Sequence, residues 1–413
     1  MERTEELKER VILAAVYTGR DESTEDSLAE LGELADTAGA QVLASMIQNR
    51  ESVHPGTYFG KGKIRELKEA VLALDATGII CDDELTPAQL NNLQQELGCK
   101  VVDRSLLILD IFARHASTAE GKLQVELAQL RYRSARLVGM RASLSRLGGG
   151  IGTRGPGEKK LETDRRLIRA RISTLKSELE ELERHRSLLR DGRARRTMKT
   201  AAIVGYTNAG KSTLLNALTG ADVLSEDKLF ATLDPTSRAL DLEDGQQILL
   251  TDTVGFIRKL PHHLVEAFRS TLEEAKYADY IIHVTDAANP QAPLQMQVVY
   301  ETLRDLGITG KPVITLFNKC DLLTDEERME VRDTRADHVL RISAARGEGL
   351  DKLKDLISHL VSEDMILIER VYPYDQAQMA GWIRAHGQLL SEEYTPEGIA
   401  VRARIPKEYY AKL

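Results

Sequence analysis

The stretch that decides the fold is GYTNAGKS, at residues 205–212. It matches the pattern G-x-x-x-x-G-K-[ST], follows the apolar run Ala201–Val204 and precedes a helical stretch, Thr213–Leu218. In such a strand–loop–helix, backbone N–H groups turn toward phosphate oxygens and the helix amino terminus adds positive potential. Chance gives this pattern in roughly one chain of this length per hundred. A plain glycine-rich helix cap is the weaker interpretation, so the stretch predicts a P-loop.

The residues around this loop suit the handling of a nucleoside triphosphate. Lys211 is expected to reach the β- and γ-phosphates, and the Ser212 hydroxyl is expected to ligate Mg²⁺. The apolar run Ile248–Thr251 ends in Asp252-Thr253-Val254-Gly255, which offers a carboxylate near the metal and a backbone N–H near the γ-phosphate. Asn208 is a candidate for placing K⁺ where an arginine finger would act, and bracing of the loop is its alternative role.

Two further segments predict that the base is guanine. Asn318-Lys319-Cys320-Asp321 ends the apolar run Pro312–Phe317, and Ser343-Ala344-Ala345 ends another. A carboxylate at Asp321 can accept from guanine N1–H and the 2-amino group. Adenine offers neither donor there and would leave a buried charge unpaired, which costs a few kcal/mol. Backbone N–H groups of the second segment can bind guanine O6, so GTP is favoured over ATP.

The segment LFATLDPT, residues 229–236, lies between the first two motifs. Thr232 is the predicted switch threonine that closes on Mg²⁺ when the γ-phosphate is present, with Thr236 as its competitor. Phe256 follows Gly255 at the position where Ras-like proteins carry a water-orienting glutamine. Phenylalanine cannot orient water, so we expect slow intrinsic hydrolysis that a partner accelerates.

The remainder of the 413-residue chain predicts four parts. Strands alternating with helices predict a small parallel α/β domain over 1–112, and heptad-like seams predict a basic helical hairpin over 113–196. A larger doubly wound α/β GTPase domain is expected over 197–362. A small α+β unit is expected over 363–413, in which Ile399, Val401, Ala403 and Ile405 alternate as in an exposed strand.

Charge is distributed unevenly along the chain. Residues 121–200 hold 21 lysines and arginines against 9 acidic residues, a net charge of +12, so the remainder carries −20 of the total −8. The arginines and lysines assigned to the hairpin's distal half are Arg131, Arg133, Arg136, Arg141, Arg146, Arg154, Lys159, Lys160, Arg165, Arg166 and Arg169. A solvated helical surface is the plainer interpretation, but the one-sided excess favours a polyanionic partner.

The run GGGIGTRGPGE, residues 148–158, contains a G-x-G-x-x-G match. A dinucleotide-binding loop must follow a strand and open a βαβ unit, whereas this run lies between two helical seams. A flexible linker also fits poorly, because Arg154 and Pro156 interrupt the glycines. We therefore predict a hairpin tip, residues 148–157, that contacts RNA.

Several other features carry less weight. Gly60-Lys61-Gly62-Lys63 is expected to be a loop leading into a helix, with a weak second nucleotide site as its alternative. His283 is expected to be a packed core residue, and His262-His263 to face solvent. The three cysteines fit neither a disulfide framework nor a zinc site, and no apolar run approaches the roughly 20 residues of a membrane span. A reducing cytosol is the expected compartment.

The motifs together resemble the HflX family of GTPases, within the Obg–HflX group. The resemblance covers nearly the whole chain and rests on GGGIGTRGPGEKKLETDRR (148–166), DRSLLILDIFARHASTAEGKLQVELAQL (103–130), GYTNAGKST (205–213), LFATLDPT (229–236), DTVGFI (252–257) and NKCD (318–321). It implies a cytoplasmic, Mg²⁺-dependent GTPase that is monomeric in solution. It also implies binding to the 50S ribosomal subunit, stimulation of hydrolysis by the ribosome, and splitting or rescue of stalled ribosomes under stress.

These expectations fix a set of site residues. Lys211, Thr232 and Gly255 are the expected catalytic residues, and Ser212 and Thr232 the expected Mg²⁺ ligands. The expected contacts to GTP or GDP are Gly205, Tyr206, Thr207, Asn208, Ala209, Gly210, Lys211, Ser212, Thr213, Phe230, Ala231, Thr232, Leu233, Asp234, Asp252, Thr253, Val254, Gly255, Asn318, Lys319, Cys320, Asp321, Ser343, Ala344 and Ala345.

Two other functions remain open at the level of sequence. One is a non-ribosomal signalling switch whose hairpin binds protein. The other is an RNA-remodelling protein that uses its amino-terminal half, with GTP acting only as a regulator.

Overall fold

The computed structural model describes residues 8–19, 24–147, 156–194, 198–220, 228–242, 246–261, 269–363 and 365–412. The chain divides into two compact units. The first comprises Met1–Glu180, Glu226–Asp234 and Ile257–Arg269, and the second comprises Glu181–Ser225, Pro235–Phe256 and Ser270–Leu413. The four-part division expected from the sequence stays a prediction. Residues 148–155 of the expected tip and His262-His263 lie outside the described residues.

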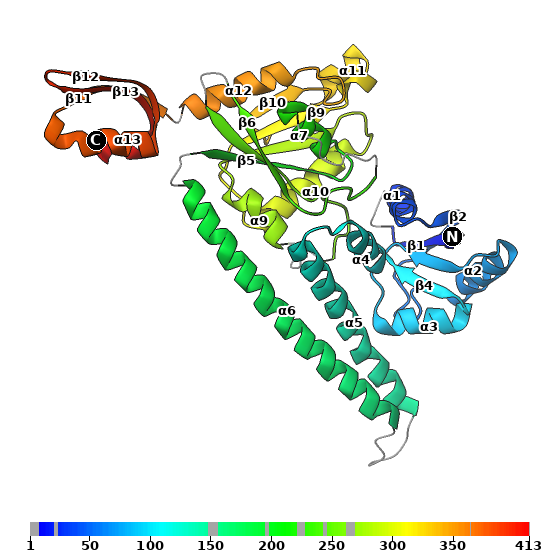
Figure 1. Cartoon of the computed structure of the whole chain (residues 1–413). Coiled ribbons are helices and arrows are strands. Elements are labelled where there is room, and N and C mark those ends of the chain that lie inside the picture. The colour runs from blue at the N-terminus through cyan, green and yellow to red at the C-terminus, as the bar shows by residue number, and fades with distance from the viewer. Residues whose placement is uncertain are drawn as a thin grey trace, which may run out of the picture. The chain divides into compact units, whose positions relative to one another are not determined.

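The first unit begins with a four-stranded sheet (Figure 1). Its strands are β1 (Arg10–Tyr17), β2 (Gln41–Asn49), β3 (Gly78–Cys81) and β4 (Lys100–Asp103), all parallel and in the order β2-β1-β3-β4. The helices that follow them are α1 (Thr24–Thr37), α2 (Lys61–Ala73), α3 (Pro87–Leu97) and α4 (Arg104–His115). The parallel α/β domain predicted from the alternating pattern is therefore confirmed.

Capping and burial explain these boundaries. Thr86 caps α3 in a reciprocal arrangement with Gln89, and Pro87 occupies the first turn, where its missing N–H is harmless. One sheet face packs against α2 and α3 through a continuous apolar cluster. The carboxyl ends of β3 and β4 carry Asp82 and Asp103, both fully buried, so acidic groups gather at that edge of the sheet.

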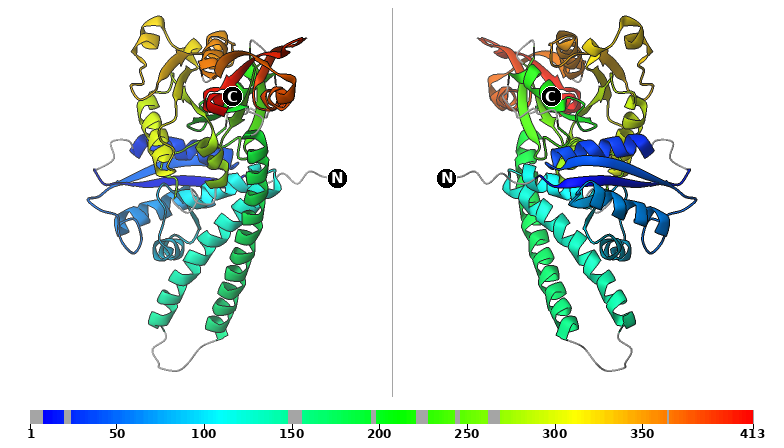
Figure 2. Two further views of the ribbon diagram at one scale, coloured as in Figure 1. Left: turned by 90° about the vertical axis from the view of Figure 1, so that its left-hand side faces the viewer. Right: turned by 90° about the vertical axis from the view of Figure 1, so that its right-hand side faces the viewer.

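Two long helices complete the first unit. They are α5 (Ala119–Leu147) and α6 (Pro156–Ala194), and they run antiparallel with one another over the part of α6 that belongs to this unit (Figure 2). The guanidinium of Arg171 on α6 forms a two-pronged ion pair with Glu126 on α5, with N···O distances of 2.8 Å. Leu175 is the buried member of the α6 seam among its described side chains. The predicted helical hairpin is therefore confirmed.

The second unit is built on a six-stranded sheet in the order β10-β9-β8-β5-β7-β6. Its strands are β5 (Lys199–Gly205), β6 (Thr236–Asp241), β7 (Gln247–Asp252), β8 (Tyr280–Asp286), β9 (Val313–Asn318) and β10 (His338–Arg341). All neighbours are parallel except β6, which pairs antiparallel with β7. Strands β5, β7 and β9 match the predicted apolar runs 201–204, 248–251 and 312–317, and β10 matches the run that ends at Ser343. Strand β6 was not predicted.

Helices cover both faces of this sheet. They are α7 (Lys211–Thr219), α9 (Arg269–Tyr277), α10 (Ala292–Asp305), α11 (Asp325–Glu330) and α12 (Leu350–Glu363). Leu214 and Leu215 of α7 and Leu353 and Ile357 of α12 pack into the main apolar cluster with the inward residues of the strands. The carboxyl ends of β5, β7 and β9 consequently lie together at one edge, where ligands bind in open parallel sheets.

The carboxyl-terminal part is an antiparallel sheet in the order β11-β13-β12. Its elements are β11 (Met365–Tyr372), α13 (Ala377–His386), β12 (Gln388–Thr395) and β13 (Gly398–Pro406). The expectation of an exposed strand over residues 399–405 is wrong, because β13 is the central strand. Its alternating apolar residues are buried with Ala380 and Ile383 of α13. Alternation marks a strand with one buried face, which a helix can cover.

None of the helices within the described residues is long and apolar enough to cross a membrane. The cysteines Cys81, Cys99 and Cys320 are all free.

His283 lies in the interior of the second unit, on β8, as expected of a core residue. Its ring nitrogens face the hydroxyls of Thr285 and Thr315, and its ring contacts Tyr300 edge-on. Burial lowers the pKa of His283 to about 4, against an opposing influence from Asp333. The folded protein therefore holds this imidazole neutral over the pH range in which the unfolded chain protonates it.

We predict that acid destabilises the protein through His283. Since the unfolded state takes up a proton near pH 6.5 and the folded state only near pH 4, stability falls as the pH drops between these values. Through this residue, wild type should lose about 3 kcal/mol of unfolding free energy between pH 7 and pH 4, at about 1.4 kcal/mol per unit of pKa difference. His283→Gln should not show this loss. Urea unfolding at several pH values measures it. Exposed His359→Gln is the control, and identical slopes for wild type and His283→Gln would contradict the prediction.

Candidate nucleotide site

The P-loop connects β5 to α7 in a backbone that requires glycine. Gly210 has φ +94°, in the left-handed region, and a Cβ there would lie 2.3 Å from Nδ2 of Asn318. At Gly205 a Cβ would lie 2.2 Å from the Val284 carbonyl oxygen. Side chains are excluded at both positions, so the loop backbone lies directly against β8 and Asn318. The pattern of two glycines five residues apart follows from this packing.

Lys211 begins α7, and its ammonium is buried. Its Nζ donates to the backbone carbonyl of Tyr206 at 2.8 Å. Burial lowers the pKa of Lys211 to about 8, partly offset by the charge of Asp252. A buried cation with one carbonyl partner is stabilised further by any anion that enters the loop.

Ser212 and Asp252 form the part of the site that suits a metal ion. The Ser212 hydroxyl donates to Oδ2 of Asp252 at 2.7 Å, which brings α7 and the end of β7 together. A hydroxyl and a carboxylate are the hard oxygen donors that Mg²⁺ prefers. Thr207 has a buried hydroxyl without a hydrogen-bond partner among the described residues. The residues present therefore fit a nucleotide–Mg²⁺ complex.

The segment after Asp252 lies directly against the P-loop. Thr207 N donates to the Phe256 carbonyl at 2.8 Å, and Phe256 N donates to the Gly205 carbonyl at 3.0 Å. A Cβ at Gly255 would lie 2.8 Å from Thr207 and 2.9 Å from Nζ of Lys211. Thr253 donates from its hydroxyl to the Ile203 carbonyl, which fixes the strand end. The Phe256 side chain is buried and apolar, so it offers no group that could orient a water molecule.

Asn318 forms hydrogen bonds with two loops at the end of β9, which we call the base end of the site because the guanine base is expected there. Its Nδ2 donates to the carbonyl of Ala209, and its Oδ1 accepts from the backbone N–H of Ala344, each at 2.9 Å. The P-loop and the segment Ser343–Ala345 are thereby held at the end of β9. Both atoms of the Asn318 amide are used within the protein.

Asp321 has neighbours that the sequence analysis did not identify. The Ser343 hydroxyl, together with Arg346, holds the pKa of Asp321 below its ordinary value. Nε of Arg346 lies 3.2 Å from Oδ2 of Asp321, so the carboxylate faces a planar cation. Lys319 pairs with Asp286 at 2.8 Å, and the Cys320 thiol donates to the carbonyl of Phe317. An arginine directly after the Ser-Ala-Ala segment was the signal available in the sequence.

Residues 229–234 of the candidate switch segment belong to the first unit, together with the amino-terminal half, and Pro235 and Thr236 belong to the second. Phe230 and Leu233 are buried, while Ala231, Thr232 and Asp234 are partly buried. The Asp234 carboxylate accepts hydrogen bonds from Ser117 and Thr118. Thr236, the competitor of Thr232, begins β6 and pairs with Asp252 in the sheet of the second unit.

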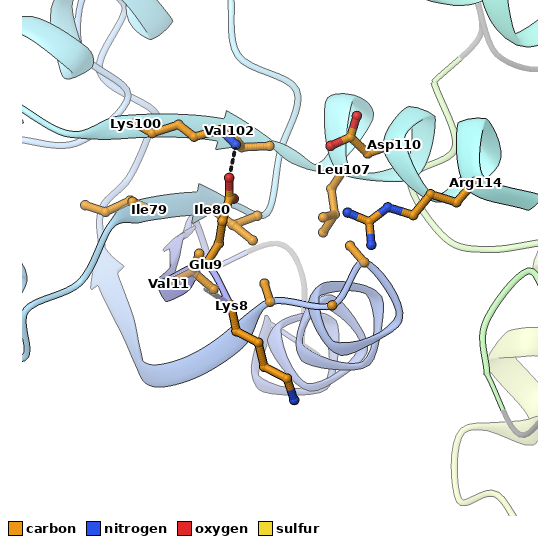
Figure 3. Close-up of a pocket in the computed structure, with 14 residues that line it drawn as sticks. Lys8, Glu9, Val11, Ile79, Ile80, Lys100, Val102, Leu107, Asp110 and Arg114 are labelled. Atoms are coloured by element: carbon orange, nitrogen blue, oxygen red, sulfur yellow. Dashed lines mark hydrogen bonds and ion pairs between the residues drawn. The ribbon is translucent and has the colours of Figure 1, made fainter. Parts of the chain in front are cut away.

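A separate cavity of about 560 Å³ lies at the amino ends of β1, β3 and β4 (Figure 3). Val11, Ile80, Val102 and Leu107 supply its apolar wall, and the Lys100–Glu9 ion pair, at 2.6 Å, crosses one side. The Gly60–Lys63 sequence has no part in its lining. Lys61 begins α2, so the structure gives that sequence the predicted role of a helix start.

The basic residues of the hairpin differ in their availability. Arg133, Arg166 and Arg169 are exposed. Arg136 differs, because its guanidinium pairs with the buried carboxylate of Asp103 at 2.5 Å and lies over the ring of Tyr132. Arg136 therefore holds α5 against β4, and the predicted polyanion-binding set is smaller by one residue.

We predict that Gly255→Ala impairs nucleotide handling without unfolding the protein. The added methyl group must displace Thr207 or the Lys211 ammonium, and overpacking of this kind costs about 1–3 kcal/mol, or roughly 5- to 150-fold in binding or rate. Dissociation of fluorescent GDP and steady-state GTP hydrolysis measure the effect. Gly381→Ala is the control, since a Cβ there meets nothing within 4 Å. Unchanged kinetics in Gly255→Ala would contradict the packing argument.

Three family models match the chain in sequence. The model described as GTP-binding GTPase N-terminal matches residues 25–113, GTP-binding GTPase Middle Region matches 115–193, and 50S ribosome-binding GTPase matches 200–319. Together they cover well over half of the chain.

Curated relatives match over nearly the full length. GTPase HflX of Lacrimispora saccharolytica is 62% identical over 408 residues, covering 99% of this chain and 96% of its own. GTPase HflX of Caldanaerobacter subterraneus is 49% identical, covering 100% and 95%, and that of Escherichia coli is 43% identical, covering 86% and 84%. A solved GTP-binding protein of Sulfolobus solfataricus in complex with GDP is 28% identical over 86% of this chain and 99% of its own, with a TM-score of 0.44. The chain belongs to the HflX family and is a GTP-binding, GTP-hydrolysing protein.

Proposed function

We propose that the protein is a Mg²⁺-dependent GTPase that acts on the 50S ribosomal subunit in the cytoplasm and splits or rescues stalled ribosomes under stress. The GTPase activity is supported by one arrangement of residues. Lys211, Ser212 and Asp252 lie together at the carboxyl ends of β5 and β7, and Asp321 follows β9. This arrangement supplies a cation, two hard oxygen ligands and a guanine-reading carboxylate. The ribosomal part is supported by the description of the matching family model, 50S ribosome-binding GTPase.

Each residue of the site has a proposed task. Lys211 neutralises the β- and γ-phosphates, and the backbone N–H groups of the P-loop bind their oxygens. Ser212 would hold Mg²⁺ with Asp252 beside it, and a bound Mg²⁺ neutralises charge that develops on the phosphates. Thr232 is the proposed second ligand. Thr236 is the weaker candidate because its backbone is held in strand β6, opposite Asp252, whereas a switch residue must move with the nucleotide.

For the remaining nucleotide contacts we propose the residues that the sequence analysis named. Asp321 binds the guanine edge after exchanging its contact with Arg346, and Ala344 and Ala345 offer backbone N–H groups near O6. Gly255 offers its N–H to the γ-phosphate. Asn208, at φ +61°, is proposed either to brace the loop or to help place K⁺.

Hydrolysis by the protein alone is proposed to be slow. The buried side chain of Phe256 leaves this position without a group that could orient water. A group from the ribosome would then complete the site, and GTP turnover would depend on the partner.

The amino-terminal part (1–112), the hairpin (113–196), the GTPase domain (197–362) and the carboxyl-terminal part (363–413) are proposed as separate domains of a protein that is monomeric in solution. The hairpin and the amino-terminal part would contact ribosomal RNA. The net charge of +12 over residues 121–200 supports this, since phosphate contacts by lysine and arginine dominate affinity for nucleic acids.

We predict that removing exposed hairpin charges weakens 50S binding and its salt dependence. Arg166→Ala/Arg169→Ala should lower affinity and reduce the slope of log K against log salt by up to about 2, because roughly one counterion is released per phosphate contact. Sedimentation with 50S subunits from 50 to 200 mM salt measures it. Lys352→Ala/Lys354→Ala on α12 removes the same charge elsewhere and should change neither value. Equal behaviour of the two double variants would argue against the hairpin as the binding element.

We predict that 50S subunits raise GTP turnover by at least about tenfold, as expected when a partner completes a phosphoryl-transfer site. Phosphate release with and without subunits, in K⁺ and in Na⁺, measures it. Lys211→Ala should abolish turnover in both conditions. The decisive test is cosedimentation with 50S subunits in GTP, GDP and a non-hydrolysable analogue. Absence from 50S with every nucleotide, or turnover by the protein alone that equals turnover with subunits, would overturn the proposal.

A further inference from the structure

Asp234 connects the candidate switch segment to Ser117 and Thr118, the two residues immediately before α5. Its Oδ2 accepts from Ser117 N at 2.9 Å, Ser117 Oγ at 2.7 Å and Thr118 N at 2.9 Å, and its Oδ1 accepts from Thr118 Oγ1 at 2.5 Å. Burial alone raises the pKa of Asp234, but these hydrogen bonds outweigh it and hold the pKa below its usual range. The carboxylate is therefore charged at neutral pH, at a helix amino terminus that favours an anion.

The surroundings of this contact fit the carboxylate closely. A Cβ at Gly121 would lie 2.3 Å from Oδ1 of Asp234, so this position in α5 has room for the carboxylate only because it is glycine. Four residues earlier, the ring of Phe230 packs edge-on against Phe112 of α4, with centroids 4.7 Å apart. The segment around Thr232 is thus held at both of its ends by α4 and α5.

Lys259 makes a second contact of this kind, from the segment that follows Gly255. Its Nζ pairs with Oδ2 of Asp82 at 2.5 Å and with Oδ1 of Asp83 at 2.8 Å. Asp82 is fully buried and also accepts from Arg104 and Ser27, so it belongs to the interior of the amino-terminal half. Both segments, Glu226–Asp234 and Ile257–Arg269, are accordingly part of the first unit, while the strands between them belong to the second.

Only a few residues separate these contacts from Thr232 and Gly255, so the contacts limit how far those two residues can move. Successive Cα atoms are 3.8 Å apart, so Thr232 can be no more than about 7 Å along the chain from Asp234. Phe230 and Asp234 are both held, so a movement that carries Thr232 beyond this reach must either displace Asp234 from Ser117 and Thr118 or move α5 with it. Gly255 and Lys259 are four residues apart, so the contact of Lys259 restrains Gly255 more loosely, within about 14 Å.

We propose that Asp234 and Lys259 are positioning residues through which the nucleotide held by the P-loop and the amino-terminal half influence each other. The inference rests on the proposed roles of Thr232 and Gly255 at the γ-phosphate. Asp234 links the first of these residues to the base of the hairpin, and Lys259 links the second to the acidic edge of β3. Whatever moves α5 changes the relative affinity for GTP and GDP, and by linkage the nucleotide changes the stability of the first turns of α5.

The test uses the full-length protein with GDP or a non-hydrolysable GTP analogue, and follows hydrogen exchange over residues 119–127. In wild type, exchange should differ between the two nucleotides. In Asp234→Ala it should become independent of the nucleotide, and the ratio of the two affinities should change at least about fivefold, the lower end of ordinary allosteric coupling. Lys259→Met should change the affinity ratio in the same way, since Asp82 keeps Arg104 and Ser27 as partners.

Thr86→Ala is the matched control, because it removes a helix cap in the same unit without touching either segment. It should leave the nucleotide dependence of exchange at α5 and the affinity ratio unchanged. Thr118→Val combined with Asp234→Ala should add no further change in the ratio, as expected for two members of one contact.

Nucleotide-independent exchange at α5 in wild type, or retained dependence in Asp234→Ala, would overturn the inference while leaving GTP binding and hydrolysis intact. Loss of GTP binding in wild type would instead overturn the proposed function, and the inference with it.

Discussion

The nucleotide site depends on backbone that is packed too closely to accept a side chain. Gly255 lies against Thr207 and the Lys211 ammonium, and Gly210 lies against the amide of Asn318. Because Asn318 binds Ala209 and Ala344 at once, the P-loop and the base-end segment hold fixed positions at the end of β9. The conformation of the P-loop therefore follows from its packing against the ends of β7, β8 and β9, and the loop sequence is one part of that packing.

The same packing determines the charge balance of the site. Lys211 is buried with a backbone carbonyl as partner, and burial lowers its pKa to about 8. A phosphate placed beside it restores the preference for the charged form, so part of the free energy of phosphate binding comes from relieving an unfavourable burial. The charge of Asp321, unlike that of Lys211, is already stabilised within the protein, by Ser343 and Arg346. Guanine bound to Asp321 as proposed would replace those contacts, so binding of the base would depend on an exchange of partners at Asp321.

The sequence predicted the parts whose physics is local. Apolar runs followed by glycine and lysine predicted β5, the P-loop and α7, because a phosphate cradle needs that order of residues. Strands β6 and β12 were not predicted, since each lies at a sheet edge and lacks a continuous apolar run. The contacts of Asn318, Arg346 and Asp234 join residues separated by 25 to 117 positions in the chain. No local pattern records contacts between residues so far apart, so the motif analysis named Asn318 and Asp234 without their partners and did not name Arg346.

Asp234 shows how a residue that the sequence assigns to a site can have another partner in the structure. Its position in LFATLDPT suggested a nucleotide contact, but its carboxylate is engaged by two hydroxyls and two backbone N–H groups at the start of α5. The acceptor is charged, so each of these hydrogen bonds contributes about 1.5–3 kcal/mol net. Because the carboxylate is only partly buried, water can take the place of the donors when the segment moves. Lys259 differs because Asp82 is fully buried, and leaving that carboxylate without one of its cations costs more than losing a surface pair. The segment after Gly255 is therefore the more firmly held of the two, and the segment around Thr232 is the one that nucleotide exchange can move more readily.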